Sequence, residues 1–241
     1  MITGTLINVA TVVVGGLLGT FLGNRLPEKM RLTVLHGLGL MTLVIGVSMA
    51  IGTKNVLIPL FSILIGGILG EALRIEEALE RLGKWAEARL GGLFGGDRST
   101  FAQGFITASL VFCVGPMTIL GSIQDGLMGD FTLLAVKSLM DGFAAMALAA
   151  SLGAGVILSA ATVLAYQGGL SVAAGLFGAA LGGVTGETPW VIEMTATGGV
   201  VILSIAFLLL DIKKIRAANL LPAVFIAPLI VLILGLLGVA F

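Results

Sequence analysis

The sequence predicts an all-α polytopic membrane protein with about eight transmembrane helices, and three observations lead to this fold class. The 241-residue chain is 58% hydrophobic and only 11% charged, whereas a soluble domain carries about 25% charged residues. Many of its 36 glycines stand within apolar stretches, where membrane helices use small residues for close packing. Lysine and arginine gather in alternate loops between those stretches, as the positive-inside rule requires.

Each predicted span rests on length, because a helix needs about 20 mostly apolar residues to cross the hydrocarbon core. The uncharged run between Asp141 and Glu187 is too long for one crossing, so we divide it near residues 151–153. The first 24 residues lack the positive charge that opens a signal peptide, so we expect a retained helix there. The eight predicted spans are residues 4–23, 32–52, 55–72, 101–122, 131–151, 155–184, 190–210 and 218–239.

The basic residues set the expected orientation. Three of them follow the first span, five follow the third and three follow the seventh, which leaves only two of the 13 elsewhere. These loops are predicted to be cytoplasmic, so both termini are expected outside. Such an orientation is independent support for an even number of crossings.

Residues 71–92 differ from the rest of the single transmembrane domain that we expect over residues 1–241. Ile75, Leu79, Leu82 and Trp85 recur at steps of three and four residues, with charged residues between them. This period predicts an amphipathic helix on the cytoplasmic membrane surface. A solvated linker helix explains the same pattern, and neither interpretation indicates chemistry.

Internal sequence similarity predicts an inverted repeat, in which spans one to three correspond to spans six to eight. Spans four and five form a central hairpin between the two halves. The glycine-rich stretches 15–19 and 182–186 each close a span, and each precedes a proline. Residues 39–51 and 199–211 also resemble each other. Because the offset of five spans is odd, the two halves would cross in opposite directions, as in many secondary transporters. Shared composition could produce the same similarity.

The central hairpin holds the strongest candidate site. Pro116 lacks an amide hydrogen and is expected to break span four, and the hydroxyl, amide and carboxylate of Ser122, Gln124 and Asp125 follow it. Lys137 and Asp141 stand four residues apart, on one face of span five. Charged residues within spans usually face the bundle interior or a pathway. These five residues predict a site for a small solute or ion.

Structural roles compete with that interpretation. Lys137 and Asp141 could simply neutralise each other and hold helices together, and Asp130 could belong to a wet outer loop, an explanation that suits Asp125 less. Asn8 in span one and Gln167 in span six are further candidate site residues. A lone Asn in a membrane is usually an interhelical hydrogen bond, and the stretch 166–169 fits either a helix break or a kink with a satisfied amide.

Two motifs carry a resemblance to a known family. The stretch CVGPMTILGSIQDGLMGD at residues 113–130 is followed by K-x-x-x-D-G from Lys137 to Gly142, and the chain opens with I-N-x-x-x-V-x-x-G-G-L-L-G from Ile7 to Gly19. With these motifs the chain resembles, over nearly its whole length, the bacterial inner-membrane family catalogued as domain of unknown function 554. The resemblance implies a multi-spanning protein of the bacterial cytoplasmic membrane. It brings no established activity and no site residue.

Composition narrows the function classes. The formal net charge is zero, so nothing favours nucleic acid as a partner, and one cysteine and one histidine give no basis for a metal site or a cofactor. We expect a small secondary transporter or channel for a solute or ion, coupled to H⁺ or Na⁺, embedded in the lipid bilayer as a homo-oligomer. The alternative is a membrane binding or scaffold protein. An intramembrane enzyme fits less well, because no Ser–His pair or metal spacing stands in the sequence.

Overall fold

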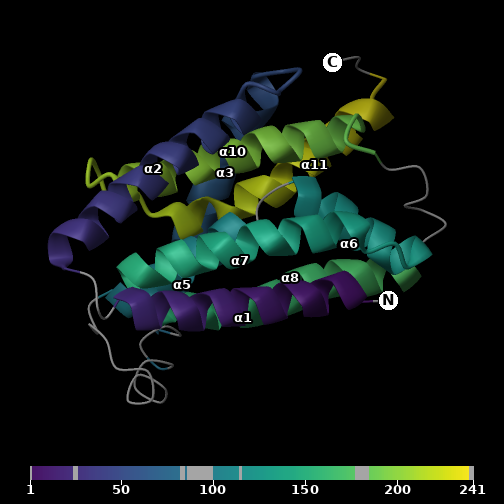
Figure 1. The fold of residues 1–241 in the computed structure, drawn as a ribbon. Helices are drawn as coiled ribbons and strands as arrows, with labels where there is room; N and C mark the ends of the chain where they lie inside the picture. Colours follow the sequence, from purple (N-terminus) through teal and green to yellow (C-terminus); the bar gives the residue numbers. More distant parts are fainter. Residues whose placement is uncertain are drawn as a thin grey trace. The chain divides into compact units, whose positions relative to one another are not determined.

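The computed structural model describes residues 2–23, 27–81, 85, 100–113, 116–176 and 185–238. All regular structure in these ranges is helical, without a strand (Figure 1). The described helices reproduce the predicted order of elements, so the all-α prediction is confirmed. Six helices in these ranges are long and apolar enough to cross a membrane, and the number reaches eight if each of two bent helix pairs counts as one span.

The helices follow the predicted spans closely. Span six is described as far as Leu176, and its predicted continuation over residues 177–184 lies outside the described residues. The last predicted span begins with the short 3₁₀ helix η2 (Ala217–Leu220). The long helices are α1 (Thr3–Gly23), α2 (Glu28–Ala50), α3 (Leu57–Ala72), α7 (Thr132–Leu152), α8 (Gly155–Leu176), α10 (Pro189–Leu209) and α11 (Leu221–Leu236).

Span four is broken where the proline predicts a break. Helices α5 (Phe101–Cys113) and α6 (Pro116–Met128) are bent by 62° relative to each other. Pro116 is the first residue of α6, a position where its missing N–H removes no intrahelical hydrogen bond. The helix continues six residues beyond the predicted end at residue 122, so Gln124 and Asp125 belong to α6 rather than to an outer loop.

A second bend follows α3. Arg74 has a φ of 51°, and the helical segment Ile75–Arg81 leaves at 52° to α3. The predicted surface helix therefore begins at Ile75 as a separate segment. Its remaining residues lie outside the described ranges, apart from Trp85, which is exposed.

Contacts divide the chain into two compact units. Unit 1 contains Met1–Leu35 and Leu79–Val184, and unit 2 contains His36–Ala78 and Thr185–Phe241. Helices α1, α5, α6, α7 and α8 belong to unit 1, whereas α3, α10, η2, α11 and most of α2 belong to unit 2. The single domain over residues 1–241 stays a prediction.

Unit 1 is built around the parallel packing of α1 on α7 (Figure 1). Three glycines of α1, at positions 15, 19 and 23, recur every fourth residue, so they lie on one helix face. A Cβ atom added at Gly15 or Gly19 would come within 2.1 Å of a backbone oxygen of α7. Only glycine allows this approach, which is the small-residue packing of membrane helices. The glycines meet the carbonyl oxygens as Gly15 with Gly142, Gly19 with Met146 and Gly23 with Ala150.

The substitution Gly19→Ala is expected to destabilise unit 1 by about 1–3 kcal/mol, because the added methyl group overpacks a backbone contact. The matched control is Gly169→Ala in α8, where an added Cβ atom meets nothing within 4 Å. The control should be neutral or slightly stabilising, since Ala is the better helix former. Denaturant titration of both purified variants in one detergent checks the difference. Equal midpoints would contradict the packing described for Gly19.

In unit 2, glycines also allow close backbone contact, here between antiparallel helices. Gly46 of α2 faces Gly199 of α10, where an added Cβ on Gly199 would lie 2.7 Å from the Gly46 oxygen. Gly66 and Gly70 of α3 likewise approach the backbones of Ala223 and Asn219. Helix α3 therefore packs on α11 and η2, and α2 packs on α10.

Candidate functional site

Three helices of unit 1 meet at the Asn8 side chain. Its Nδ2 atom donates hydrogen bonds to Asp141 Oδ2 of α7 at 2.9 Å and to Gln167 Oε1 of α8 at 3.0 Å. Asn8 stands seven residues before Gly15 and eleven before Gly19, so it lies on the same face of α1. The glycine packing that brings α1 onto α7 therefore also turns Asn8 into the bundle, where it is fully buried.

Asp141 carries the charge of this cluster. Its carboxylate forms an ion pair with Lys137, one helical turn earlier on α7, as the four-residue spacing predicts. Both side chains are at most 10% exposed, and Asp141 stands beside Gly142, the middle residue of α7. Because a lone buried charge is costly, the pair is what makes burial of either group tolerable.

Gln167 extends the cluster toward the start of α1. Its Nε2 atom donates to Thr5 Oγ1 at 3.3 Å, and both residues are fully buried. Helix α8 runs through residues 166–169 without interruption, so a helix break is not observed there, and the Gln167 amide has partners for both its oxygen and its nitrogen. We call Thr5, Asn8, Lys137, Asp141 and Gln167 the polar network. Thr5 is not among the residues that the sequence singles out.

Asp125 binds a different part of α1. Its Oδ2 atom accepts the Gly4 backbone N–H at 2.9 Å, which lies in the first turn of the helix, where amide groups lack intrahelical partners. The carboxylate is fully buried and interacts favourably with the positive end of the helix dipole. Asp125 and Asp141 therefore hold α1 at positions one turn apart and do not form a carboxylate pair.

The remaining predicted site residues have local roles. The Ser122 hydroxyl donates to the Thr118 carbonyl of its own helix at 2.6 Å, and Gln124 is half-buried on α6. Asp130 is exposed before α7 and accepts the Thr132 N–H at 3.0 Å. That backbone bond and the Thr132 hydroxyl lower the pKa of the Asp130 carboxyl. The wet-loop interpretation thus describes Asp130 and not Asp125.

One buried acceptor of the polar network is left over. Asn8 Oδ1 accepts no hydrogen bond within the described part of the chain, although the side chain is fully buried. A buried polar atom without a partner costs about 1–3 kcal/mol. Within the described residues, the network therefore leaves the Asn8 side-chain oxygen without a protein donor.

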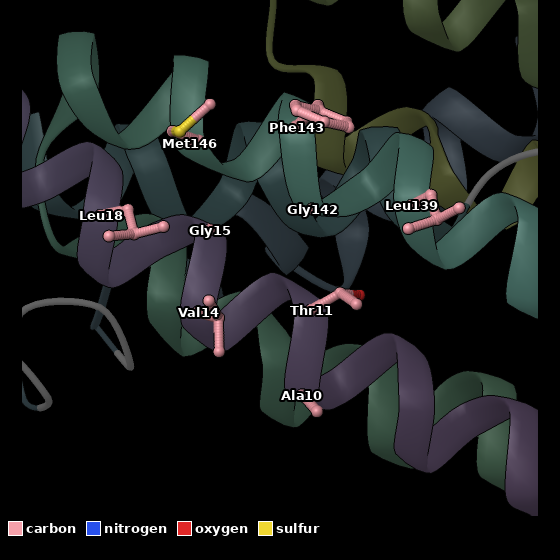
Figure 2. Close-up of a pocket in the computed structure, with 9 residues that line it drawn as sticks. All are labelled: Ala10, Thr11, Val14, Gly15, Leu18, Leu139, Gly142, Phe143 and Met146. Carbon is pink, nitrogen blue, oxygen red and sulfur yellow. The ribbon is translucent and has the colours of Figure 1, made fainter.

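An apolar groove of about 310 Å³ runs between α1 and α7 (Figure 2). Its floor is the crossing of Gly15 and Gly142, and Leu139 and Phe143 rise on its α7 side. Thr11 supplies the one hydroxyl of the lining, and that hydroxyl donates to the backbone carbonyl oxygen of Asn8 at 2.9 Å. The groove offers a surface suited to lipid and no polar opening into the network. Its lining residues are Ala10, Thr11, Val14, Gly15, Leu18, Leu139, Gly142, Phe143 and Met146.

Unit 2 holds a buried carboxylate that is not among the predicted site residues. Glu193 of α10 is 1% exposed and accepts hydrogen bonds from Thr53 Oγ1 at 2.6 Å and from the Lys54 N–H at 2.7 Å. The Asn55 N–H adds a third bond at 3.2 Å. An acidic residue inside an apolar span was the available signal, but its partners lie about 140 residues earlier in the chain.

A second polar cluster in unit 2 fastens the segment after α3 to η2. The Glu76 N–H donates to Asn219 Oδ1 at 2.8 Å, and Glu76 Oε2 accepts the Ala218 N–H at 3.1 Å. The Asn219 amide in turn donates to Glu71 at 2.7 Å. These bonds satisfy helix-end groups, which indicates a structural role.

The apolar helices and the ion pair enclosed among them define an integral membrane protein. The chain belongs to the family described as "Protein of unknown function (DUF554)", whose model matches residues 3–232. This confirms the resemblance carried by the central and N-terminal motifs. Among the described residues, no group of three or more His, Cys, Asp and Glu side chains could hold a metal ion.

Two curated relatives match nearly the whole chain. The "Uncharacterized membrane protein YdfK" of Bacillus subtilis (strain 168) is 27% identical over 99% of both chains. The "Uncharacterized protein YqgA" of Escherichia coli (strain K12) is 30% identical and covers 94% of this chain and 95% of its own. No solved structure matches.

Proposed function

We propose that this protein is a small secondary transporter or channel, and that the polar network of unit 1 is its site for a small solute or ion. The observation that carries the proposal is Asp141, a buried carboxylate at the middle of a membrane-spanning helix that side chains of α1 and α7 hold directly. Ionisable groups at this depth are costly and are usually retained for a pathway.

Transport through this site requires movement. The side chains of the polar network bind one another, and the groove beside them is apolar. A solute could reach Asp141 only after the contacts of α1 with α7 or α8 loosen. Such a change, in which a closed site opens, is how carriers alternate their access.

The packing within each unit supports the inverted repeat as part of this proposal. The repeat pairs span one with six, two with seven and three with eight. In unit 1, α1 contacts α8 directly, and Gly16 faces Ile157 while Asn8 faces Gln167. In unit 2, α2 packs on α10 and α3 on α11. Each predicted counterpart thus packs antiparallel on its partner, as helices beside a two-fold axis in the membrane plane would.

The remaining parts of the proposal rest on sequence. The family resemblance implies the bacterial cytoplasmic membrane, and the basic loops favour an orientation with both termini outside. At 24.6 kDa, one chain offers little room for a gated path, so we expect a homo-oligomer. H⁺ or Na⁺ is the proposed coupling ion, and we propose no enzymatic activity.

A flux assay tests the proposal. Purified protein in liposomes is screened for Na⁺, H⁺ and small-solute flux, comparing wild type with Asp141→Asn. We expect the substitution to lower flux at least about tenfold, because an interaction worth 1.4 kcal/mol already changes a rate tenfold. Asp130→Asn is the matched control, since Asp130 is exposed outside the network. Equal flux through all three proteins would contradict the proposal that transport passes through the polar network.

A membrane scaffold is the second candidate, and two observations favour it. The polar network is closed, and the segment Ile75–Arg81 is anchored to η2 through Glu76, as a fixed cytoplasmic contact would be. This role predicts that Asp141→Asn leaves a cellular phenotype intact, whereas Leu79→Glu or Trp85→Glu abolishes it. The transport proposal predicts the reverse, so one complementation experiment separates the two.

A further inference from the structure

Asp141 Oδ2 lies between two nitrogen donors. The Lys137 ammonium binds it from the same helix, and the Asn8 amide nitrogen binds it from α1. The same amide nitrogen also binds Gln167 Oε1. One Asn8 nitrogen is thus shared by two oxygens that belong to different helices.

The other end of this amide is the unsatisfied one. Asn8 Oδ1 has no partner among the described residues, although its side chain is completely buried. A half-turn of the Asn8 amide would exchange its oxygen and nitrogen within nearly the same volume. Oδ1 would then face Asp141 Oδ2 and Gln167 Oε1. Three oxygens from three helices would converge, and a cation among them would be attracted to all three.

The charge of the site defines which cation fits. Asp141 is the one carboxylate of the polar network, so one positive charge neutralises it. Lys137 supplies that charge in the present structure. A monovalent metal ion would supply it equally well, whereas a divalent ion would leave an uncompensated positive charge in an apolar bundle. A proton would neutralise Asp141, but the resulting O–H could donate to only one of the two amide oxygens.

We propose that the Lys137 ammonium is a tethered substitute for a free alkali-metal ion of Na⁺ type, which binds Asp141 Oδ2, Asn8 Oδ1 and Gln167 Oε1 when Lys137 withdraws. Carboxylate and amide oxygens are ligands for hard cations. Lys137 stands in the second turn of α7, so its displaced ammonium would extend along its flexible stem toward the polar end of the helix, and Na⁺ would then neutralise Asp141 without leaving a second positive charge in the apolar bundle. The inference rests on the proposed function for its purpose, because it names the coupling ion of that site.

The test removes the tethered cation. Lys137→Met is purified in detergent, and its thermal unfolding midpoint is measured in NaCl and in choline chloride at equal concentration. We expect a saturable Na⁺-specific rise of about 5–10 °C, the shift that a ligand at roughly 100 times its Kd gives a chain of this size. Wild type should shift several-fold less, because the ammonium competes. Lys137→Met/Asp141→Asn should show no Na⁺ response.

Lys137→Gln, which keeps one hydrogen-bond donor beside Asp141, is measured in parallel. A variant that folds in Na⁺ and not in choline supports the proposal. Equal midpoints in both salts overturn it, and so does failure of both variants to fold in Na⁺, since the free ion should replace the missing charge. The measurement needs no flux. Binding without flux would remove the transport proposal alone, and flux without binding would remove this inference alone.

Discussion

Lys137→Met, measured without alkali-metal ions, is expected to destabilise the protein by about 3–5 kcal/mol, and adding Asp141→Asn is expected to recover most of that loss. Removing one partner of a buried pair leaves an uncompensated charge among apolar side chains, whereas removing both charges is often neutral. Asn at position 141 keeps an oxygen that can accept the Asn8 hydrogen bond, which has a length of 2.9 Å to Asp141 in the present structure.

A double-mutant cycle in denaturant measures this coupling. The four proteins are wild type, the two single variants and the double variant, and the coupling energy is the departure from additivity. Arg216→Met is the control for loss of an ordinary ion pair, because Arg216 and Glu71 are 59% and 57% exposed and such pairs contribute about 0–1 kcal/mol. Additive costs along the cycle would show that Lys137 and Asp141 do not depend on each other.

The spans were predictable because their signals are local. A crossing needs a length of apolar chain, and the bend between α5 and α6 needs a proline, so both follow from neighbouring residues. The end of span four was not predictable in the same way. Gln124 and Asp125 resemble a helix end, but α6 continues because Asp125 is satisfied by the Gly4 N–H, 121 residues away in the sequence.

In the candidate site, too, contacts within one helix were predictable from the sequence, whereas contacts between distant helices were not. The Lys137–Asp141 pair follows from a spacing of four on one helix. Asn8 and Gln167 could be named as candidates, yet their bond to each other spans 159 residues and no local pattern predicts it. Thr5 has a short polar side chain of a kind common in membrane helices, and the partners of Glu193 are remote in the sequence. Their hydrogen bonds are therefore seen only in the packed structure.

The groove between α1 and α7 lies close to the polar network but does not give a polar path into it. It is the surface beside the site, but its lining is apolar apart from Thr11. In the proposed transport role, access to Asp141 would therefore require the glycine contacts of α1 with α7 to separate. The tight contacts of Gly15 and Gly19 with the α7 backbone stabilise the packing of α1 on α7. Substitutions such as Gly19→Ala, which loosen this packing, would therefore also change access to the polar network.

Glu193→Ala in unit 2 is expected to cost about 3–5 kcal/mol and to free the loop between α2 and α3. Hydrogen bonds to a charged group contribute about 1.5–3 kcal/mol each, and their effects are not additive. Glu193 accepts three of them, from Thr53, Lys54 and Asn55. Asn55 in turn accepts the Leu57 N–H through its side chain at 3.1 Å. The Glu193 carboxylate therefore orders the loop that begins α3, and its loss leaves several donors without an acceptor.

Cleavage at Lys54 measures this prediction directly, because trypsin cleaves after lysine. The backbone N–H of Lys54 is one of the groups that donate to Glu193. We expect Glu193→Ala to be cut at Lys54 many times faster than wild type in detergent, and Glu193→Gln to fall between them, since an amide oxygen still accepts but without charge. Glu187→Ala is the matched control, as Glu187 is exposed just before α10. Cleavage of Glu193→Ala no faster than that of the control would show that the loop is ordered by something other than this carboxylate.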